Sequence, residues 1–159
     1  MKLLNLIDEF TRECLAIVIG TLARRAIKRG RPPALLRFDN GPEFVRHAVA
    51  DWCHDSGVDS VFIDPGSPWQ NAWIESFNRR LRDDLFNVWQ FDSLLEARVI
   101  IGDHRIDYNI HRPHSALNQQ TPAGFAANWT RQLSVMVGGV SDMLIVVSPV
   151  RSTRQCLRG

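Results

Sequence analysis

The sequence predicts a mixed α/β fold in which helices pack against a small sheet. Short β-branched runs come first, strand-like and helix-like segments alternate in the middle, and helical periodicity dominates later. This order of segments is typical of domains that combine a sheet with covering helices. The chain has 159 residues, 45% hydrophobic and 23% charged, so it is long enough to bury one core.

The first predicted elements are two antiparallel strands joined by a tight polar turn. Residues 3–7 are apolar, residues 14–19 are rich in β-branched side chains, and residues 8–12 between them include two acids and an arginine. Residues 21–29 then consist largely of alanine, leucine, arginine and lysine, which favour a helix. Gly30 is a normal helix stop.

The next segment predicts a strand that ends at an acid. Residues 34–38 form a short apolar run, and Asp39 follows directly at its carboxyl end. Residues 40–43 read Asn-Gly-Pro-Glu, which is typical of a helix start with proline at its first position. We expect this helix to end near residue 57 and a brief strand to follow at residues 61–63.

Residues 68–86 predict a long amphipathic helix. Glu75 lies about 100° around this helix from Ile74 of the apolar stripe, and Arg79 and Arg82 share its side. We therefore expect Glu75 on an exposed face beside two cations. The apolar stripe consists of Ile74, Phe77, Leu81 and Leu85.

The last third of the chain predicts two more helices and an unusual tail. Residues 93–109 form the first helix, and residues 122–129 form a short second helix capped by Thr121. We expect Trp89 in the core. From residue 132 onward, two apolar runs with glycines between them fit a β-hairpin at a sheet edge, and sequence foreign to the domain fits equally well.

Charge and cysteine content narrow the functional classes. The net charge of +2 permits a nucleic-acid partner without requiring one. Cys14, Cys53 and Cys156 lie far apart, which supports neither a zinc knuckle nor a disulfide framework and makes a reducing, cytoplasmic location the simplest interpretation. The first apolar run is too short for a signal peptide and no segment is apolar enough to span a bilayer, so no membrane partner is expected.

Two acids carry the candidate chemistry, and 35 residues lie between them. Asp39 follows a predicted strand and Glu75 lies on a predicted helix face. Carboxylate oxygens are the ligands that Mg²⁺ prefers, and a pair of such ions can activate an attacking oxygen and stabilise a leaving one. Spacing alone favours more ordinary roles, a turn or cap residue for Asp39 and a solvated side chain for Glu75.

The residues around these acids resemble those of a known family. Residues 37–44 read Arg-Phe-Asp-Asn-Gly-Pro-Glu-Phe, and residues 65–78 read Pro-Gly-Ser-Pro-Trp-Gln-Asn-Ala-Trp-Ile-Glu-Ser-Phe-Asn. They resemble the integrase catalytic core of bacterial insertion-sequence transposases of the OrfB type, in the DDE or retroviral-integrase superfamily. The resemblance covers residues 1–128 and leaves residues 129–159 as an unmatched C-terminal tail. Further similar stretches are residues 8–16, 80–85 and 107–122.

The resemblance implies a ribonuclease H-like fold with a DDE site, in which two Asp and one Glu bind two Mg²⁺ or Mn²⁺ ions. Asp39 matches the second acid and Glu75 the last, which makes both the implied catalytic and metal-binding residues. The family's first Asp lies on a strand before the one at residues 3–7. We therefore expect an incomplete, N-terminally truncated core whose first strand is missing. Asp8 matches a position that is not catalytic.

The implied function is DNA transposition by metal-dependent phosphodiester cleavage and strand transfer. The implied partners are terminal-repeat and target DNA, with a homo-oligomer or a full-length transposase as the protein partner. Because one acid of the set is absent, we expect the chain alone to be nearly inactive as a polynucleotidyl transferase. The alternative is a non-catalytic remnant that binds DNA or a transposase.

Three further residues are candidates for contacting DNA: Asn71, Arg79 and Arg82. Asn71 contacts DNA or orients Glu75, and a loop-capping role explains it equally well. His111 and His114 are expected to serve surface packing or hydrogen bonding rather than metal binding.

Overall fold

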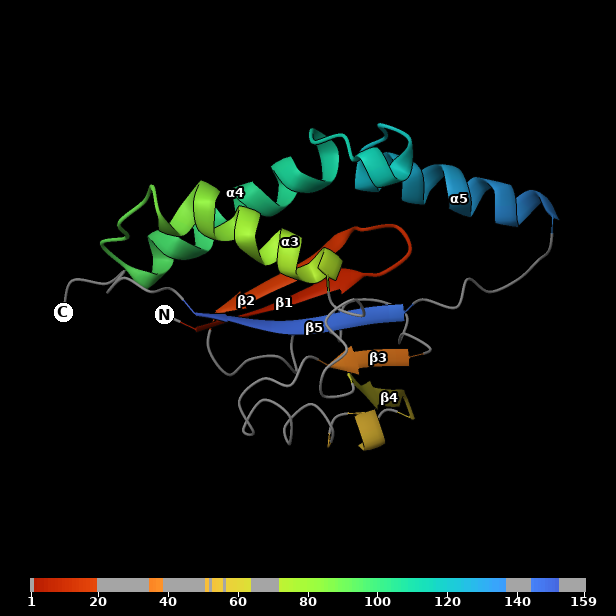
Figure 1. Ribbon diagram of the computed structural model, residues 1–159, viewed down its shortest axis with the longest axis horizontal. Coiled ribbons are helices and arrows are strands. Elements are labelled where there is room, and N and C mark those ends of the chain that lie inside the picture. The colour runs from red at the N-terminus through yellow and green to blue at the C-terminus, as the bar shows by residue number, and fades with distance from the viewer. Residues whose placement is uncertain are drawn as a thin grey trace.

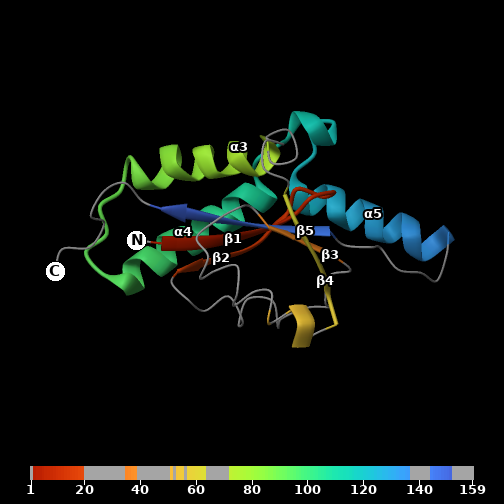
Figure 2. The same ribbon diagram turned by 60° about the horizontal axis from the view of Figure 1, so that its bottom comes forward.

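A five-stranded mixed sheet forms one layer of the molecule, and helices cover one of its faces (Figure 1). The computed structural model describes residues 2–19, 35–38, 51, 53–55, 57–63, 72–136 and 144–151. Helices α3 (Ala72–Leu81) and α4 (Leu94–Ile110) lie over the sheet, and α5 (Pro122–Met136) extends beyond the end of α4 (Figure 2). The predicted α/β architecture is confirmed.

Four strands lie where the sequence predicts them, or within two residues. β1 (Lys2–Asp8) and β2 (Cys14–Ile19) pair antiparallel, and β3 (Leu35–Phe38) pairs parallel with β4 (Asp59–Phe62). The order across the sheet is β2-β1-β5-β3-β4. The two strand pairs therefore do not touch each other, because a fifth strand separates them.

That fifth strand, β5 (Leu144–Arg151), comes from the C-terminal tail. It runs antiparallel to β1 and parallel to β3, so the expectation of a hairpin at a sheet edge was wrong. Leu-Ile-Val-Val at its start is typical of a strand paired on both sides. The described pairing of β5 with β3 ends at Val147, so Pro149 has only β1 as a described neighbour. Proline has no backbone N–H, and at this position no hydrogen bond to β3 is needed from it.

The helices agree with the predicted periodicity but differ at their ends. α3 passes into a π-helical turn at Arg82–Phe86 instead of continuing as an α-helix. α4 begins after Ser93, whose side chain accepts a hydrogen bond from the Glu96 backbone N–H at 3.1 Å. α5 runs to residue 136 rather than 129, because no helix breaker occurs before the glycines at 138 and 139.

The core lies between the helices and the β1–β2 side of the sheet. The predicted stripe is buried, with each of its four side chains at most 4% exposed. Trp89, expected inside, is 48% exposed, so that prediction was wrong. The central cluster consists of Leu3, Ile7, Cys14, Ile74, Phe77, Leu81, Leu85, Phe86, Phe91, Ala97, Ile101 and Tyr108.

Several sequence predictions fall outside the described residues. They are the helix at residues 21–29, most of the helix ending near residue 57, the acid Asp39 and the amide Asn71. Among the helices that the structure does describe, none combines the length and the apolar character needed to cross a bilayer.

Candidate functional site

Glu75 lies in the first turn of α3 with its side chain exposed, directly after the fully buried Ile74. Arg79 follows one turn later and is also exposed. Neither side chain has an ion pair with another described residue. Arg82 is exposed too, but it opens the π-helical turn, so the α-helical spacing that placed it beside Glu75 no longer fixes its direction.

The convergence of the two acids remains a prediction. Asp39 follows β3, whose last described residue is Phe38, and the described residues do not include Asp39 or Asn71. The structure brings Glu75 and Arg79 together on one exposed side of α3. Within the described part of the chain, no three acids, histidines or cysteines come close enough together to hold a metal ion.

A buried amide pair fixes α3 to the sheet. Asn5 Nδ2 on β1 donates to Asn78 Oδ1 on α3 at 2.8 Å, and both residues are at most 5% exposed. Because Asn78 lies three residues after Glu75, this bond sets the rotation of the helix that presents Glu75 to solvent. The sequence analysis assigned neither asparagine a role. Their positions, one inside the apolar run of β1 and one beside the buried stripe, were the available signal.

Asp8 serves the β1–β2 turn. Its Oδ1 accepts hydrogen bonds from the backbone N–H groups of Phe10 and Thr11, both at 2.8 Å, and the residue is 6% exposed. Its backbone carbonyl accepts from the Arg12 N–H at 2.9 Å. This carboxylate oxygen therefore stabilises the chain reversal between β1 and β2.

Arg37 connects the strand that precedes Asp39 to the same turn. Its Nη1 lies 3.0 Å and 2.8 Å from the two carboxylate oxygens of Glu9. Since β5 separates β3 from β1 in the sheet, and Arg37 and Asp8 pair with Val146 and Ile145, this ion pair bridges over the amino end of that middle strand. It ties the end of β3 to the end of β1.

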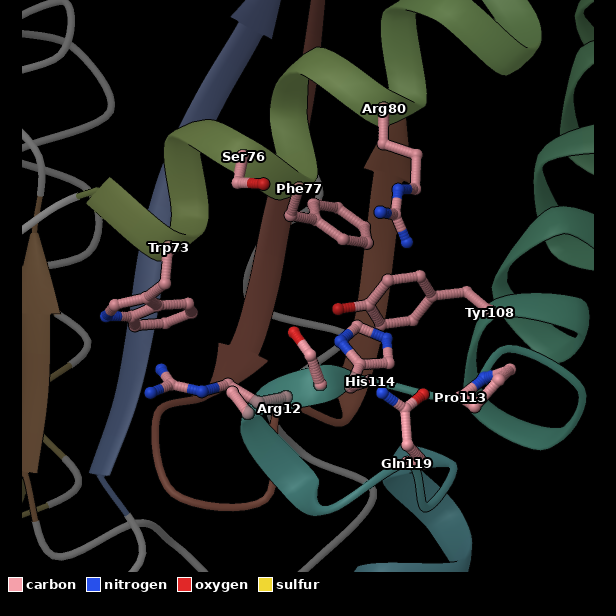
Figure 3. A pocket seen from close by; sticks show the side chains of 11 residues that line it. Arg12, Trp73, Ser76, Phe77, Arg80, Tyr108, Pro113, His114 and Gln119 are labelled. Atoms are coloured by element: carbon pink, nitrogen blue, oxygen red, sulfur yellow. The ribbon is translucent and has the colours of Figure 1, made fainter.

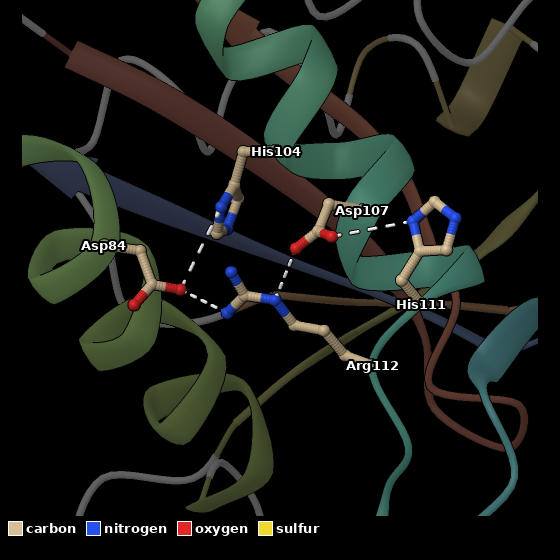
Figure 4. Close-up of polar contacts among 5 residues, drawn as sticks. All are labelled: Asp84, His104, Asp107, His111 and Arg112. Atoms are coloured by element: carbon tan, nitrogen blue, oxygen red, sulfur yellow. Dashed lines mark hydrogen bonds and ion pairs between the residues drawn. The ribbon is translucent and has the colours of Figure 1, made fainter.

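Arg112 joins the end of α4 to the π-helical turn after α3 (Figure 4). Its Nε donates to Asp107 Oδ2 at 2.6 Å, and its Nη1 donates to Asp84 Oδ2. The hydrogen bond from Arg112 lowers the pKa of Asp107. His104, whose Nδ1 is 4.0 Å from Asp84 Oδ2, has a pKa lowered by burial and by the nearby Arg112 charge.

His111 and His114 also take part in local contacts. His111 Nδ1 lies 3.5 Å from Asp107 Oδ1. The His114 ring packs edge-on against Tyr108, with ring centroids 4.9 Å apart. The segment around Arg112 thus locks α4 against the helix that bears Glu75, which the sequence could not show because the contacting residues are far apart in the chain.

Comparison with known proteins identifies two matching family profiles, both described as an integrase core domain. One matches residues 1–68 and the other residues 56–122. A 39.2 kDa protein of insertion element IS476 from Xanthomonas euvesicatoria is 43% identical over 142 residues, covering 83% of this chain and 41% of the relative. A 31.7 kDa protein of insertion element IS407 from Burkholderia multivorans is 43% identical over 137 residues, covering 80% of this chain and 49% of the relative.

A more distant relative is named for its activity. The transposase for insertion sequence element IS904 from Lactococcus lactis is 26% identical over 119 residues, covering 74% of this chain and 45% of that protein. The chain thus spans less than half the length of each of these three curated relatives.

Proposed function

Because the chain belongs to the integrase core family found in insertion elements, we propose that it is the catalytic-core portion of a transposase that cleaves and joins DNA strands. The observation that carries the proposal is Glu75, an exposed carboxylate without a described ion-pair partner, inside the region that both the relatives and the integrase profile match. An exposed acid without any other role would contribute only to the solubility of the protein. The integrase match supports a chemical role for this one.

Glu75 fits a metal ligand as far as the described residues reach. Its carboxylate is accessible and anionic, and hard divalent cations such as Mg²⁺ or Mn²⁺ take oxygen ligands of this kind. Asp39 is the second ligand we propose, from its place directly after β3. When bound, two such ions supply an activated attacking oxygen and stabilisation of the leaving oxygen of a phosphodiester.

The arginines near Glu75 supply contacts to the DNA backbone. Arg79 and Arg82 are exposed and unpaired among the described residues, so their guanidinium groups are available to phosphate oxygens. Asn71 is proposed to contact DNA at the start of the same helix. These contacts position a strand and carry no base sequence information, so sequence choice rests elsewhere.

We propose that β5 completes the sheet without completing the catalytic set. The resemblance expects a strand before β1 that carries the first Asp, and in this structure β5 occupies the position between β1 and β3. Residues 144–151 contain no Asp or Glu, and Ser148 is the residue that pairs with Asn5 of β1. A chain limited to these 159 residues then has two of the three implied carboxylates and should be catalytically impaired.

The test is a cleavage and strand-transfer assay on terminal-repeat DNA with Mg²⁺ or Mn²⁺, using the 159-residue chain. We expect almost no product. Ser148→Asp adds a carboxylate at the strand position opposite Asn5, and we expect it to raise product formation in a way that Glu75→Gln removes. Robust turnover by the unaltered chain that Glu75→Gln abolishes would contradict the proposed impairment. Activity indifferent to Glu75→Gln would overturn the assigned role.

A second candidate function is non-catalytic binding of DNA or of an intact transposase. The exposed arginines favour it, because they need no third carboxylate to hold phosphate. DNA binding that weakens with salt, without cleavage even in Ser148→Asp, would support this alternative. Co-purification with a longer transposase would support the protein-binding form of it.

A further inference from the structure

A cavity of about 430 Å³ lies on the other side of α3 from Glu75. Its walls come from four separate segments: Arg12 from the β1–β2 turn, Trp73 and Arg80 from α3, Tyr108 from α4, and His114 from the segment after α4 (Figure 3). Trp73 and Arg80 lie roughly 140–160° around the helix from Glu75 at 100° per residue. The cavity and the Glu75 side are thus two separate surfaces of one helix.

Three nitrogen atoms of residues that line this cavity are buried in its walls and lack hydrogen-bond partners among the described residues. They are Arg12 Nη1, Trp73 Nε1 and His114 Nε2. Guanidinium and indole N–H groups only donate, and a neutral imidazole can donate from one nitrogen. Buried donors without an acceptor are rare in folded proteins because each loses its hydration without compensation. Three around one cavity point to an acceptor-rich guest.

The charge of the lining determines the sign of that guest. Arg12 and Arg80 both border the cavity, and none of the described residues that line it is an Asp or Glu. The hydroxyls of Ser76, Ser115 and Tyr108 add neutral donors. The pKa of His114 is lowered by burial and then by the charges of Arg80, Arg12 and Arg112, in line with a positively charged lining. A group with several anionic oxygens fits this donor set.

The turn before the cavity holds Arg12 in place. Arg12 has φ of 63°, in the left-handed region that is costly for a side-chain-bearing residue, and its backbone N–H donates to the Asp8 carbonyl. Its guanidinium lies 4.8 Å from the centre of the Trp73 ring. Asp8 therefore acts as a positioning residue, since the turn that it caps places Arg12 in the lining of the cavity, with its guanidinium over the Trp73 ring.

We propose that this cavity binds a phosphate group of a nucleic-acid strand, separately from the chemistry assigned to Glu75. Two arginines and three hydroxyl groups belong to residues that line one small volume, and that volume falls within the range of small-ligand sites. The inference rests on the proposed function only for the source of the phosphate. Free inorganic phosphate shares the recognition chemistry, so the experiment includes both.

The experiment follows the Trp73 indole N–H by nitrogen–proton NMR in the full chain, with the signal assigned from Trp73→Phe. Inorganic phosphate is titrated first, then a short oligonucleotide with and without a 5′-phosphate. We expect a saturable downfield shift with phosphate. Arg80→Gln should weaken binding about tenfold or more, as for loss of a charge-assisted contact. Arg98→Gln, at an exposed arginine of α4 outside the cavity lining, is the matched control, and it should change phosphate affinity less than about twofold.

Several outcomes decide the matter. No saturable shift with phosphate, or equal weakening by Arg98→Gln and Arg80→Gln, overturns the site. Binding of free phosphate that no oligonucleotide displaces overturns the nucleic-acid source. Tighter binding of the 5′-phosphorylated strand supports a strand end, and equal binding of both strands supports an internal phosphate. Glu75→Gln should leave the shift intact, so a failed cleavage assay and a failed phosphate titration remain distinguishable.

Discussion

The amide pair that joins α3 to β1 gives a quantitative test of how this fold presents Glu75. Asn78→Ala removes the acceptor of the Asn5 amide at a site where both residues are at most 5% exposed. A buried donor left unsatisfied costs about 1–3 kcal/mol, and the small cavity adds to this. We expect the free energy of unfolding to fall by about 2–3 kcal/mol and the Tm by about 4–12 °C.

A double-mutant cycle measured by urea unfolding separates the bond from simple burial. Replacing both partners, Asn5→Leu with Asn78→Leu, should be much less harmful than the sum of the two single changes, with a coupling energy of about 1–3 kcal/mol. Asn87→Ala is the matched control, because Asn87 bonds Asp83 at 3.1 Å on the exposed surface and should change stability by less than about 0.5 kcal/mol. Additive single effects, or an equally harmful Asn87→Ala, would refute the reasoning.

Three further predictions concern the tail strand, the Arg112 junction and pH. Removing residues 144–159 should abolish cooperative urea unfolding, because β1 and β3 lose their shared neighbour. Removing residues 152–159 should leave cooperative unfolding intact. Equal stability of the two shortened chains would argue against the central position of β5. Arg112→Lys keeps the charge but not the planar fork between Asp84 and Asp107, so urea unfolding should show a loss of about 1 kcal/mol, and an unchanged value would mean that the junction contributes nothing. Burial lowers the pKa of His104 below 6.5, so the unfolded chain binds more protons than the folded one. The stability that follows is present above pH 6.5 and should be lost as the pH falls below it. We therefore expect the Tm to decline from pH 7 to pH 5, and to decline less in His104→Gln.

Local sequence patterns predicted most of the described elements because those elements depend on near neighbours in the chain. The apolar run of β1, the β-branched run of β2 and the three-and-four spacing of α3 each identify one buried face. Glu75 could be placed on the exposed side of its helix for the same reason. The π-helical turn at Arg82–Phe86 was missed because its residues have ordinary helical preferences, so only its packing distinguishes it.

Features built from distant segments were beyond local patterns. The cavity beside α3 forms because Arg12, Trp73 and His114 lie close together in the fold, and the sequence around each of these residues does not predict this. The Asn5–Asn78 bond joins residues 73 apart. Trp89 was assigned to the core on residue type alone, but it follows a helix end and remains 48% exposed, since large aromatic side chains are often only partly covered.

Under the proposed function, completing the sheet with β5 and completing the catalytic set are separate requirements. The matched ranges, residues 1–68 and 56–122, include every described strand except β5. Without a strand between them, β1 and β3 would each expose a row of unpaired backbone groups. Any apolar segment of suitable direction and length satisfies that need, because the ladder is made by the backbone. A metal site instead requires a carboxylate at one register position, and this chain has Ser148 at the position that pairs with Asn5. Under the proposed function, the fold can therefore persist where the chemistry does not.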